Sequence, residues 1–139
     1  IDTSYQITGA VGDAVSVSAE FQCDGTGTGG SGAYRGVVLS TLATQTGAGP
    51  TNLTAVDNGA SSANGLVANL HITSNTASLT VVIQHSTDNV TYTNLVTFTT
   101  AAGTASEHKI VTGTVNRYLR VQWSGTAGTR TFAVTAARK

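Results

Sequence analysis

Residues 79–98, LTVVIQHSTDNVTYTNLVTF, decide the fold of this chain. Apolar side chains occupy every second position from Leu79 to Ile83, and the alternation resumes at Tyr92 after the polar cluster at 86–89. A period of two on both sides of a short Ser/Asp/Asn cluster indicates two antiparallel strands joined by a tight turn. Residues 117–123, RYLRVQW, alternate in the same way and predict another strand.

Further candidate strands lie on both sides of this stretch, separated by Gly, Asn, Ser and Asp. The full set of expected strands is 5–9, 14–23, 35–40, 65–73, 77–85, 92–100, 107–112, 117–124 and 131–137. A mixed polar stretch at 41–64 interrupts the set, and no window of about 11 residues carries the apolar stripe of a helix. The sequence therefore predicts an all-β fold, an antiparallel β-sandwich or jelly roll.

The glycine-rich segment 24–32, DGTGTGGSG, is typical of a linker. It divides the chain into an N-terminal hairpin or arm at 1–23 and a sandwich domain at 33–139. A two-stranded hairpin is marginal alone, so we expect 1–23 to join a neighbouring subunit or a missing upstream domain. The side chains expected to make that assembly contact are Tyr5, Ile7, Val15, Val17 and Phe21. The chain begins at Ile1 and contains no Met, so we expect it to be the C-terminal part of a longer protein.

The composition favours a subunit of an assembly. The chain has 25 Thr, 18 Ala and 16 Gly, with 40% apolar and only 10% charged residues. Thr suits a pleated, half-buried surface, and a surface with so few charges would be adhesive on a free monomer. We therefore expect much of the surface to be covered by partners, above all by copies of the same chain.

The formal charges are unevenly distributed along the chain. Residues 1–70 carry a net charge of −4 and residues 71–139 carry +4. This pattern fits either chance placement on a solvated surface or a subunit whose acidic part meets the basic part of a neighbour. The basic residues are few and scattered, so no nucleic-acid binding is expected.

The sequence contains no motif that points to catalysis, a metal or a cofactor. His71, His85 and His108 fall in separate strands with few acids nearby, and Cys23 stands alone. The glycines of 24–32 are not followed by the Lys-Ser/Thr of a phosphate loop, and no Gly-x-Ser-x-Gly elbow is present. We expect no enzyme activity and no cofactor. No apolar run is long enough to span a membrane, and no signal peptide is visible.

Residues 117–123 also suggest a ligand surface. Tyr118, Arg120 and Gln122 form the expected outward set of that strand, and Tyr92 belongs to the preceding hairpin. Aromatic rings and arginine suit carbohydrate recognition, so Tyr92, Tyr118 and Arg120 are candidate glycan contacts. Trp123 shares the opposite phase with Leu119, which favours a core anchor over a ligand platform.

Two resemblances add to this interpretation. IQHSTDNVTYTNL (83–95) and RYLRVQW (117–123) resemble the S-x-D-x-x-x-[WY] hairpin and R-Y-[LVI]-R strand of discoidin-like jelly rolls. With TNLTAVDNGASSANGLVANLHIT (51–73) ahead and TFAVTAARK (131–139) behind, the pair is similar to a C-terminal domain of tailed-bacteriophage structural proteins. That domain tends to follow a tail-tube domain. SYQITGAVGDAVSVSAEFQCDG (4–25), followed by RGVVL (35–39), resembles the closing hairpin of such a tube domain.

The phage resemblance implies a virion structural protein, assembled in the host cytoplasm, whose partners are copies of itself and other virion proteins. It favours a tail-tube subunit or its outward-facing C-terminal domain. A capsid decoration (cementing) protein, with 1–23 laid across capsid subunits, is a second possibility. A third is a carbohydrate-binding module that recognises host surface glycans. The resemblance implies no catalytic residue.

Overall fold

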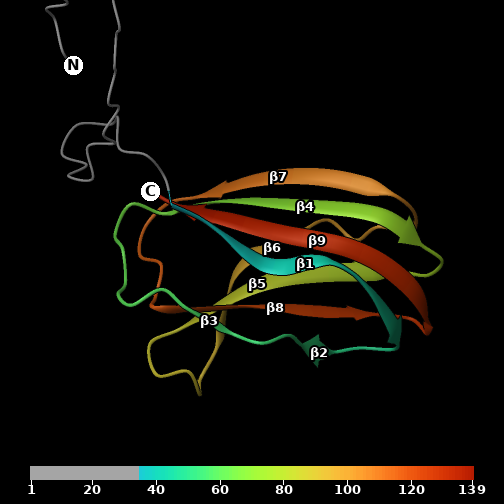
Figure 1. The fold of residues 1–139 in the computed structure, drawn as a ribbon, viewed down its shortest axis with the longest axis horizontal. Coiled ribbons are helices and arrows are strands. Elements are labelled where there is room, and N and C mark those ends of the chain that lie inside the picture. The colour runs from blue at the N-terminus through green and yellow to red at the C-terminus, as the bar shows by residue number, and fades with distance from the viewer. Residues whose placement is uncertain (1–34) are drawn as a thin grey trace, which may run out of the picture. The chain divides into compact units, whose positions relative to one another are not determined.

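The computed structural model describes residues 35–139, which form two antiparallel β-sheets packed face to face and contain no helix (Figure 1). The all-β sandwich expected from the sequence is therefore confirmed. The expected strands 5–9 and 14–23 and the linker 24–32 lie outside the described residues. The same holds for the predicted assembly residues, which are Tyr5, Ile7, Val15, Val17 and Phe21.

The two sheets share the nine described strands unequally. The four-stranded sheet has the order β1 (Arg35–Gly47), β9 (Gly128–Arg138), β4 (Leu66–Asn75) and β7 (Ala105–Val111). The five-stranded sheet has the order β2 (Thr51–Asn52), β8 (Tyr118–Gly125), β5 (Leu79–Ser86) and β6 (Thr93–Thr97), and β3 (Val56–Asp57) also pairs with β8.

The pairings are nested around the β5–β6 hairpin, which residues 79–98 form. β5 pairs with β6, β4 with β7, β2 and β3 with β8, and β1 with β9, all antiparallel. With β2 and β3 counted as one interrupted strand, this is one long hairpin rolled up so that its layers alternate between two sheets. That winding is the jelly roll.

The core consists of the inward positions that the alternation predicts. Every second residue from Leu66 to Ile72 in β4 and from Leu119 to Trp123 in β8 is buried, and Trp123 is only 2% exposed. The inward set of these two strands is Leu66, Ala68, Leu70, Ile72, Leu119, Val121 and Trp123. The assignment of Trp123 to the core is therefore confirmed. β5 is buried on both faces, because Gln84 and Ser86 are covered as well as Ile83.

Several elements differ from expectation. β1 runs to Gly47, seven residues beyond the predicted end at 40, because its Thr- and Ala-rich second half is held by main-chain pairing with β9. β2 and β3 lie within the stretch 41–64 that showed no alternation. The turn after β5 is a six-residue loop, 87–92, rather than a four-residue turn.

In this loop, side-chain oxygens bind the backbone N–H groups in place of a neighbouring strand. The Asp88 carboxylate accepts hydrogen bonds from the backbone N–H groups of Val90 (2.9 Å) and Thr91 (2.8 Å). Ser86 Oγ donates to Asp88 and accepts from the N–H of Asn89, which has a positive φ of 61°. Asn is one of the few residues that adopts this left-handed conformation readily, so the loop is specified by its residue types.

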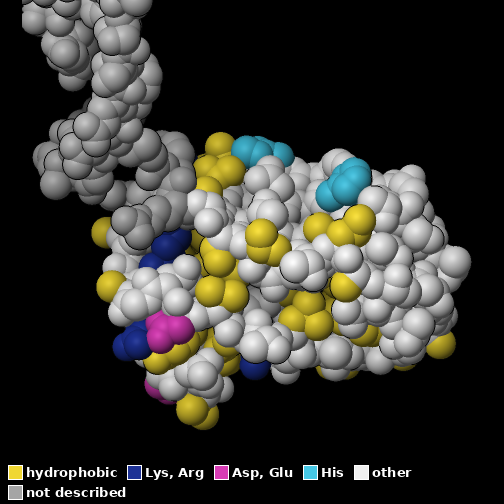
Figure 2. Space-filling view, in the orientation of Figure 1, with side chains coloured by type: hydrophobic (Ala, Val, Ile, Leu, Met, Phe, Trp, Pro, Cys, Tyr) yellow, Lys and Arg dark blue, Asp and Glu magenta, His cyan; other side chains and the backbone are white. Residues whose placement is uncertain are grey.

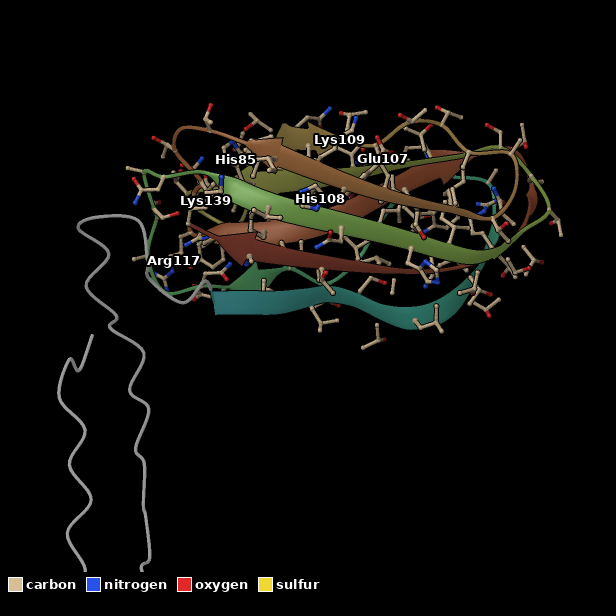
Figure 3. The ribbon with its side chains drawn as sticks, turned by 90° about the horizontal axis from the view of Figure 1, so that it is seen from above. His85, Glu107, His108, Lys109, Arg117 and Lys139 are labelled. Carbon is tan, nitrogen blue, oxygen red and sulfur yellow. The ribbon has the colours of Figure 1, made fainter. Side chains whose placement is uncertain are left out.

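Charged residues on β7 connect the two sheets along one side of the sandwich. Glu107 and Lys109 lie on β7, an edge strand (Figure 3). They pair with the buried Leu70 and Ala68 of β4 and so face the same side as those residues. Glu107 accepts hydrogen bonds from the N–H (2.7 Å) and hydroxyl (3.0 Å) of Thr99, and Lys109 donates to the carbonyl of Thr97 (2.7 Å). These bonds join the β7 edge to the chain at the end of β6 in the other sheet.

Candidate functional site

The outer surface of the five-stranded sheet carries the candidate glycan contacts. We call it the polar face and define it by its outward side chains, which are Asn52, Gln84, Tyr92, Asn94, Tyr118, Arg120 and Gln122. Alternation along β8 places Tyr118, Arg120 and Gln122 on this surface, while the residues between them enter the core. Tyr92 reaches it from the end of the 87–92 loop.

The structure brings Tyr92 and Arg120 into direct contact. The Arg120 guanidinium carbon lies 3.7 Å from the centroid of the Tyr92 ring, a close cation–π arrangement. Tyr118 is two residues from Arg120 on the same face of β8. The three predicted residues therefore lie on one face, and Tyr92 and Arg120 are in direct contact.

A chain of amides fixes the orientation of Arg120. Arg120 Nε donates to Gln84 Oε1 (2.9 Å), and Gln84 Nε2 donates in turn to Asn94 Oδ1 (2.8 Å). Gln84 is only 7% exposed although it faces outward, so this chain is anchored beneath the surface. A second amide pair, in which Gln122 Nε2 donates to Asn52 Oδ1 (2.8 Å), lies alongside.

Tyr92 is a hydrogen-bond donor at this site. Its hydroxyl donates to Asn89 Oδ1 in the 87–92 loop. Burial raises the pKa of the Tyr92 hydroxyl, although the positive charge of Arg120 opposes that shift. The phenol therefore stays protonated near neutral pH, and the ring serves as a stacking surface.

A bidentate ion pair forms the border of the polar face. Arg117 donates to both carboxylate oxygens of Asp57 at 2.7 and 2.6 Å, and its guanidinium carbon lies 4.9 Å from the Tyr118 ring centroid. The Arg117 hydrogen bonds, with help from the N–H of Gly59, lower the pKa of Asp57 to about 2. Lys and Arg side chains, with an acidic one beside them, gather near the same end of the domain in Figure 2. Because the pair is exposed, it orients Arg117 more than it stabilises the fold.

The described carboxylates are all engaged. Asp57 binds Arg117, Glu107 binds Lys109 (3.2 Å) and Thr99, and Asp88 binds the N–H groups of its own loop. Within residues 35–139 no three His, Cys, Asp or Glu side chains come together as a metal-ligand set. The polar face therefore presents aromatic rings, a guanidinium and side-chain amides, and the described carboxylates are bound elsewhere.

The three histidines lie apart from the polar face. His71 and His108 are exposed on β4 and β7 at the outer surface of the four-stranded sheet, where Figure 2 shows two separate His patches. Their Nδ1 atoms lie 2.6 Å from Ser106 Oγ and 3.0 Å from Asn69 Oδ1. His85 is half-buried and accepts a hydrogen bond from the N–H of Asn116 (3.2 Å), and burial lowers its pKa.

A second feature of functional interest is the free edge of β1. Among the described strands, this 13-residue strand pairs only with β9, and the β1 edge from Gly36 to Gly47 contains no charged residue and no proline. Val38 and Leu42 are 53% and 57% exposed along it. Register irregularities between Val38 and Ala43 separate two regularly paired stretches of the strand.

Sequence reasoning missed Arg130. This side chain points inward from β9, in phase with Phe132, and is completely buried. Its guanidinium carbon lies 4.5 Å from the Trp123 ring centroid, and its Nη2 donates to the carbonyl of Thr126 (2.7 Å). Among the described residues, Arg130 Nε and Nη1 and the Trp123 indole Nε1 have no hydrogen-bond partner. The signal that could have revealed it is its spacing of two from Phe132.

In the part of the chain that the structure describes, no helix is both long and apolar enough to cross a membrane. Known protein families, curated proteins and solved structures gave no match to this chain.

Proposed function

We propose that this chain is a structural subunit of a tailed-phage virion, a tail-tube protein or its outward-facing C-terminal domain, which acts by self-assembly. The observation that carries the proposal is the uncharged β1 edge. The resemblance of 4–25 and 51–139 to phage structural proteins gives the kind of particle.

A long uncharged edge is unusual in a protein that remains monomeric. Unpaired N–H and C=O groups along an edge strand pair readily with another chain, and soluble proteins block such edges with charges, prolines or very short strands. The other sheet edges of this domain have such protection, since β7 carries inward-facing Glu107 and Lys109 and β6 has only five residues. From Gly36 to Gly47, β1 has irregularities in its middle but no charged residue, so a partner strand can pair with the regular stretch on either side of them.

The charge distribution supports contacts between unlike parts of neighbouring copies. Residues 1–34 contain four acidic and no basic residues, whereas residues 35–139 contain seven basic and three acidic residues. Opposite charges on two parts of one chain favour head-to-tail contacts, which close into rings or extend into tubes.

The experiment compares the full chain with Leu42→Lys, which adds a charge to the β1 edge. Size-exclusion chromatography with light scattering and negative-stain microscopy should show oligomers for the parent and smaller species for the variant. The matched control is Val90→Lys, which replaces an exposed apolar residue (80% exposed) in the 87–92 loop. Both variants should keep the melting temperature of the parent, because both positions are exposed.

Two results would overturn this proposal. One is a parent chain that stays monomeric at every concentration and does not co-purify with virions. The other is a loss of association in Val90→Lys that matches the loss in Leu42→Lys. Antibody labelling of intact particles distinguishes a tail location from the capsid exterior.

A second candidate function is carbohydrate binding at the host surface, and the specific observation in its favour is the convergence of Tyr92, Tyr118 and Arg120. A protein displayed on a virion can carry both functions. A glycan array probed with the parent chain and with Tyr118→Ala tests it. Binding by the parent and a loss in the variant support this function, and an array without any signal removes it.

A further inference from the structure

We propose that Arg120 is the anchor for a carboxylate and that the polar face takes an acidic saccharide, one with a uronic-acid-type carboxylate. This inference rests on the second proposed function and specifies the chemical class of its ligand. It concerns the five-stranded sheet, whereas the proposed assembly edge lies on the other sheet.

The Arg120 guanidinium is held ready for such a ligand. Stacking on Tyr92 fixes the plane of the group, and the Nε bond to Gln84 fixes its rotation within that plane. No described residue accepts a hydrogen bond from Arg120 Nη1 or Nη2. A planar group with two parallel N–H donors matches a carboxylate, and immobilising it before binding reduces the entropy lost on binding.

The described carboxylates do not occupy this guanidinium. Asp57 is bound bidentately by Arg117, and Glu107 lies on β7 of the other sheet, bound to Lys109 and Thr99. Asp88 is near enough to influence Tyr92, but its Oδ1 accepts from Ser86, Val90 and Thr91, and the described acceptor from Arg120 is Gln84. Arg120 therefore differs from Arg117, whose charge the domain itself neutralises.

The surroundings of Arg120 suit the hydroxyl groups of a sugar. Asn52 and Gln122 on one side, and Asn94 on the other, each use only one amide atom in the bonds described above. No described residue bonds their remaining amide donors and acceptors, which can bind hydroxyl groups. Tyr118 lies about 7 Å along β8 from Arg120, because strands rise by roughly 3.4 Å per residue, and its ring offers a further contact surface.

The test uses nuclear magnetic resonance titration of the full chain with methyl glucuronide, and with methyl glucoside as the neutral probe. We expect the glucuronide to shift the Arg120 Nε–H signal and the backbone signals of β8, with an affinity about tenfold higher than that of the glucoside. Arg120→Gln should abolish the difference between the two probes. Arg120→Lys should retain only part of it, because a lysine lacks the planar fork.

Arg117→Gln is the matched control, since it removes a neighbouring guanidinium that is already paired. It should leave the preference for the glucuronide unchanged. Thermal melts of each variant show whether the fold is intact, and Gln84→Ala, which frees Arg120 Nε without removing the charge, gives an independent loss of affinity if Arg120→Gln fails to fold.

Each remaining outcome has a distinct meaning. Equal affinity for glucuronide and glucoside overturns the carboxylate inference and leaves glycan binding standing. No shift with either probe, together with a glycan array without signal, overturns both the carboxylate inference and the proposed glycan binding. If a synthetic peptide of residues 1–34, with its four acids, binds at Arg120 and the glucuronide does not, the occupant is an acidic protein segment and the saccharide inference is wrong.

Discussion

At the scale of single residues, two buried side chains that touch have opposite energetic roles. Trp123 and Arg130 meet inside the sandwich, with the guanidinium over the indole ring. The indole adds apolar area to the core. The guanidinium places a charge where one of its nitrogens has a described partner and two have none.

We expect Trp123→Ala to reduce the free energy of unfolding by about 3–5 kcal/mol, through lost burial and an unfilled cavity. Thermal and urea melts of the full chain measure it. The control is Gln122→Ala, on the outward face of the same strand, which should change the stability by less than about 1 kcal/mol. A Trp123→Ala melting temperature equal to that of the parent would contradict the burial assignment.

We expect Arg130→Met to leave the stability unchanged or to raise it by about 1–4 kcal/mol, because an apolar side chain of similar length removes an uncompensated buried charge. Arg130→Ala should instead destabilise the protein, since it leaves a cavity against Trp123. Urea melts of the two variants separate the effect of removing the charge from the effect of removing side-chain volume. A marked loss of stability in Arg130→Met would mean that the contact with Trp123 outweighs the desolvation of the guanidinium.

At the scale of elements, the 87–92 loop depends on one carboxylate. Hydrogen bonds from the N–H groups of Val90 and Thr91 and from the Ser86 hydroxyl lower the pKa of Asp88 to about 2. Because the unfolded value is about 4, the unfolded chain binds the proton first as the pH falls. The stability contributed by Asp88 is complete above about pH 4 and is lost as the pH falls through about 2.

We therefore expect the melting temperature of the parent to fall between about pH 4 and pH 2, and Asp88→Asn to show a shallower fall. Asp57→Asn should reduce the slope by a separate amount, because the pKa of Asp57 is also lowered to about 2 and its partner lies elsewhere. Circular dichroism melts across this pH range measure both effects. Identical slopes for the parent and Asp88→Asn would contradict the role of the carboxylate.

Elements with alternating apolar residues were predictable from the sequence, and elements held mainly by main-chain pairing were not. β4, β5 and β8 show the period of two because one face of each enters the core. The second half of β1 has no such pattern, since Thr44 and Gln45 are ordered by pairing with β9. The residues of the polar face were predicted in part, because Tyr118 and Arg120 alternate with core residues.

The contact partners at the polar face were beyond sequence reasoning. Arg120, Gln84 and Asn94 lie on three different strands, and only the register of β5 against β6 and β8 places them in one row. Arg130 was missed for a related reason. A charged residue at the start of a strand is expected to face solvent, and the phase of β9 overrides that expectation.

At the scale of the whole molecule, nested pairing should govern folding. Apart from the β5–β6 hairpin, each described strand pair joins residues far apart in sequence, so loop closure precedes most stabilising contacts. We expect folding in milliseconds to seconds, with the β5–β6 hairpin formed early and β1–β9 paired last. Trp123, the one tryptophan of the chain, reports the process by stopped-flow fluorescence.

Two core substitutions test this order. Val96→Ala on β6 should slow folding, whereas Leu39→Ala on β1 should mainly speed unfolding. Both residues are buried in the same core, and both substitutions remove only apolar side-chain carbons. A reversed pattern would show that the first and last strands pair before the central hairpin.

The nested winding also places the two ends of the domain next to each other. Arg35 pairs with Arg138, so the polypeptide enters and leaves the sandwich at neighbouring positions of one sheet (Figure 1). A module with adjacent entry and exit points can be spliced into a surface loop of another protein without stretching the host or the insert. Residues 35–139 are therefore suited to insertion into a surface loop of a host protein, because both ends of the module lie together.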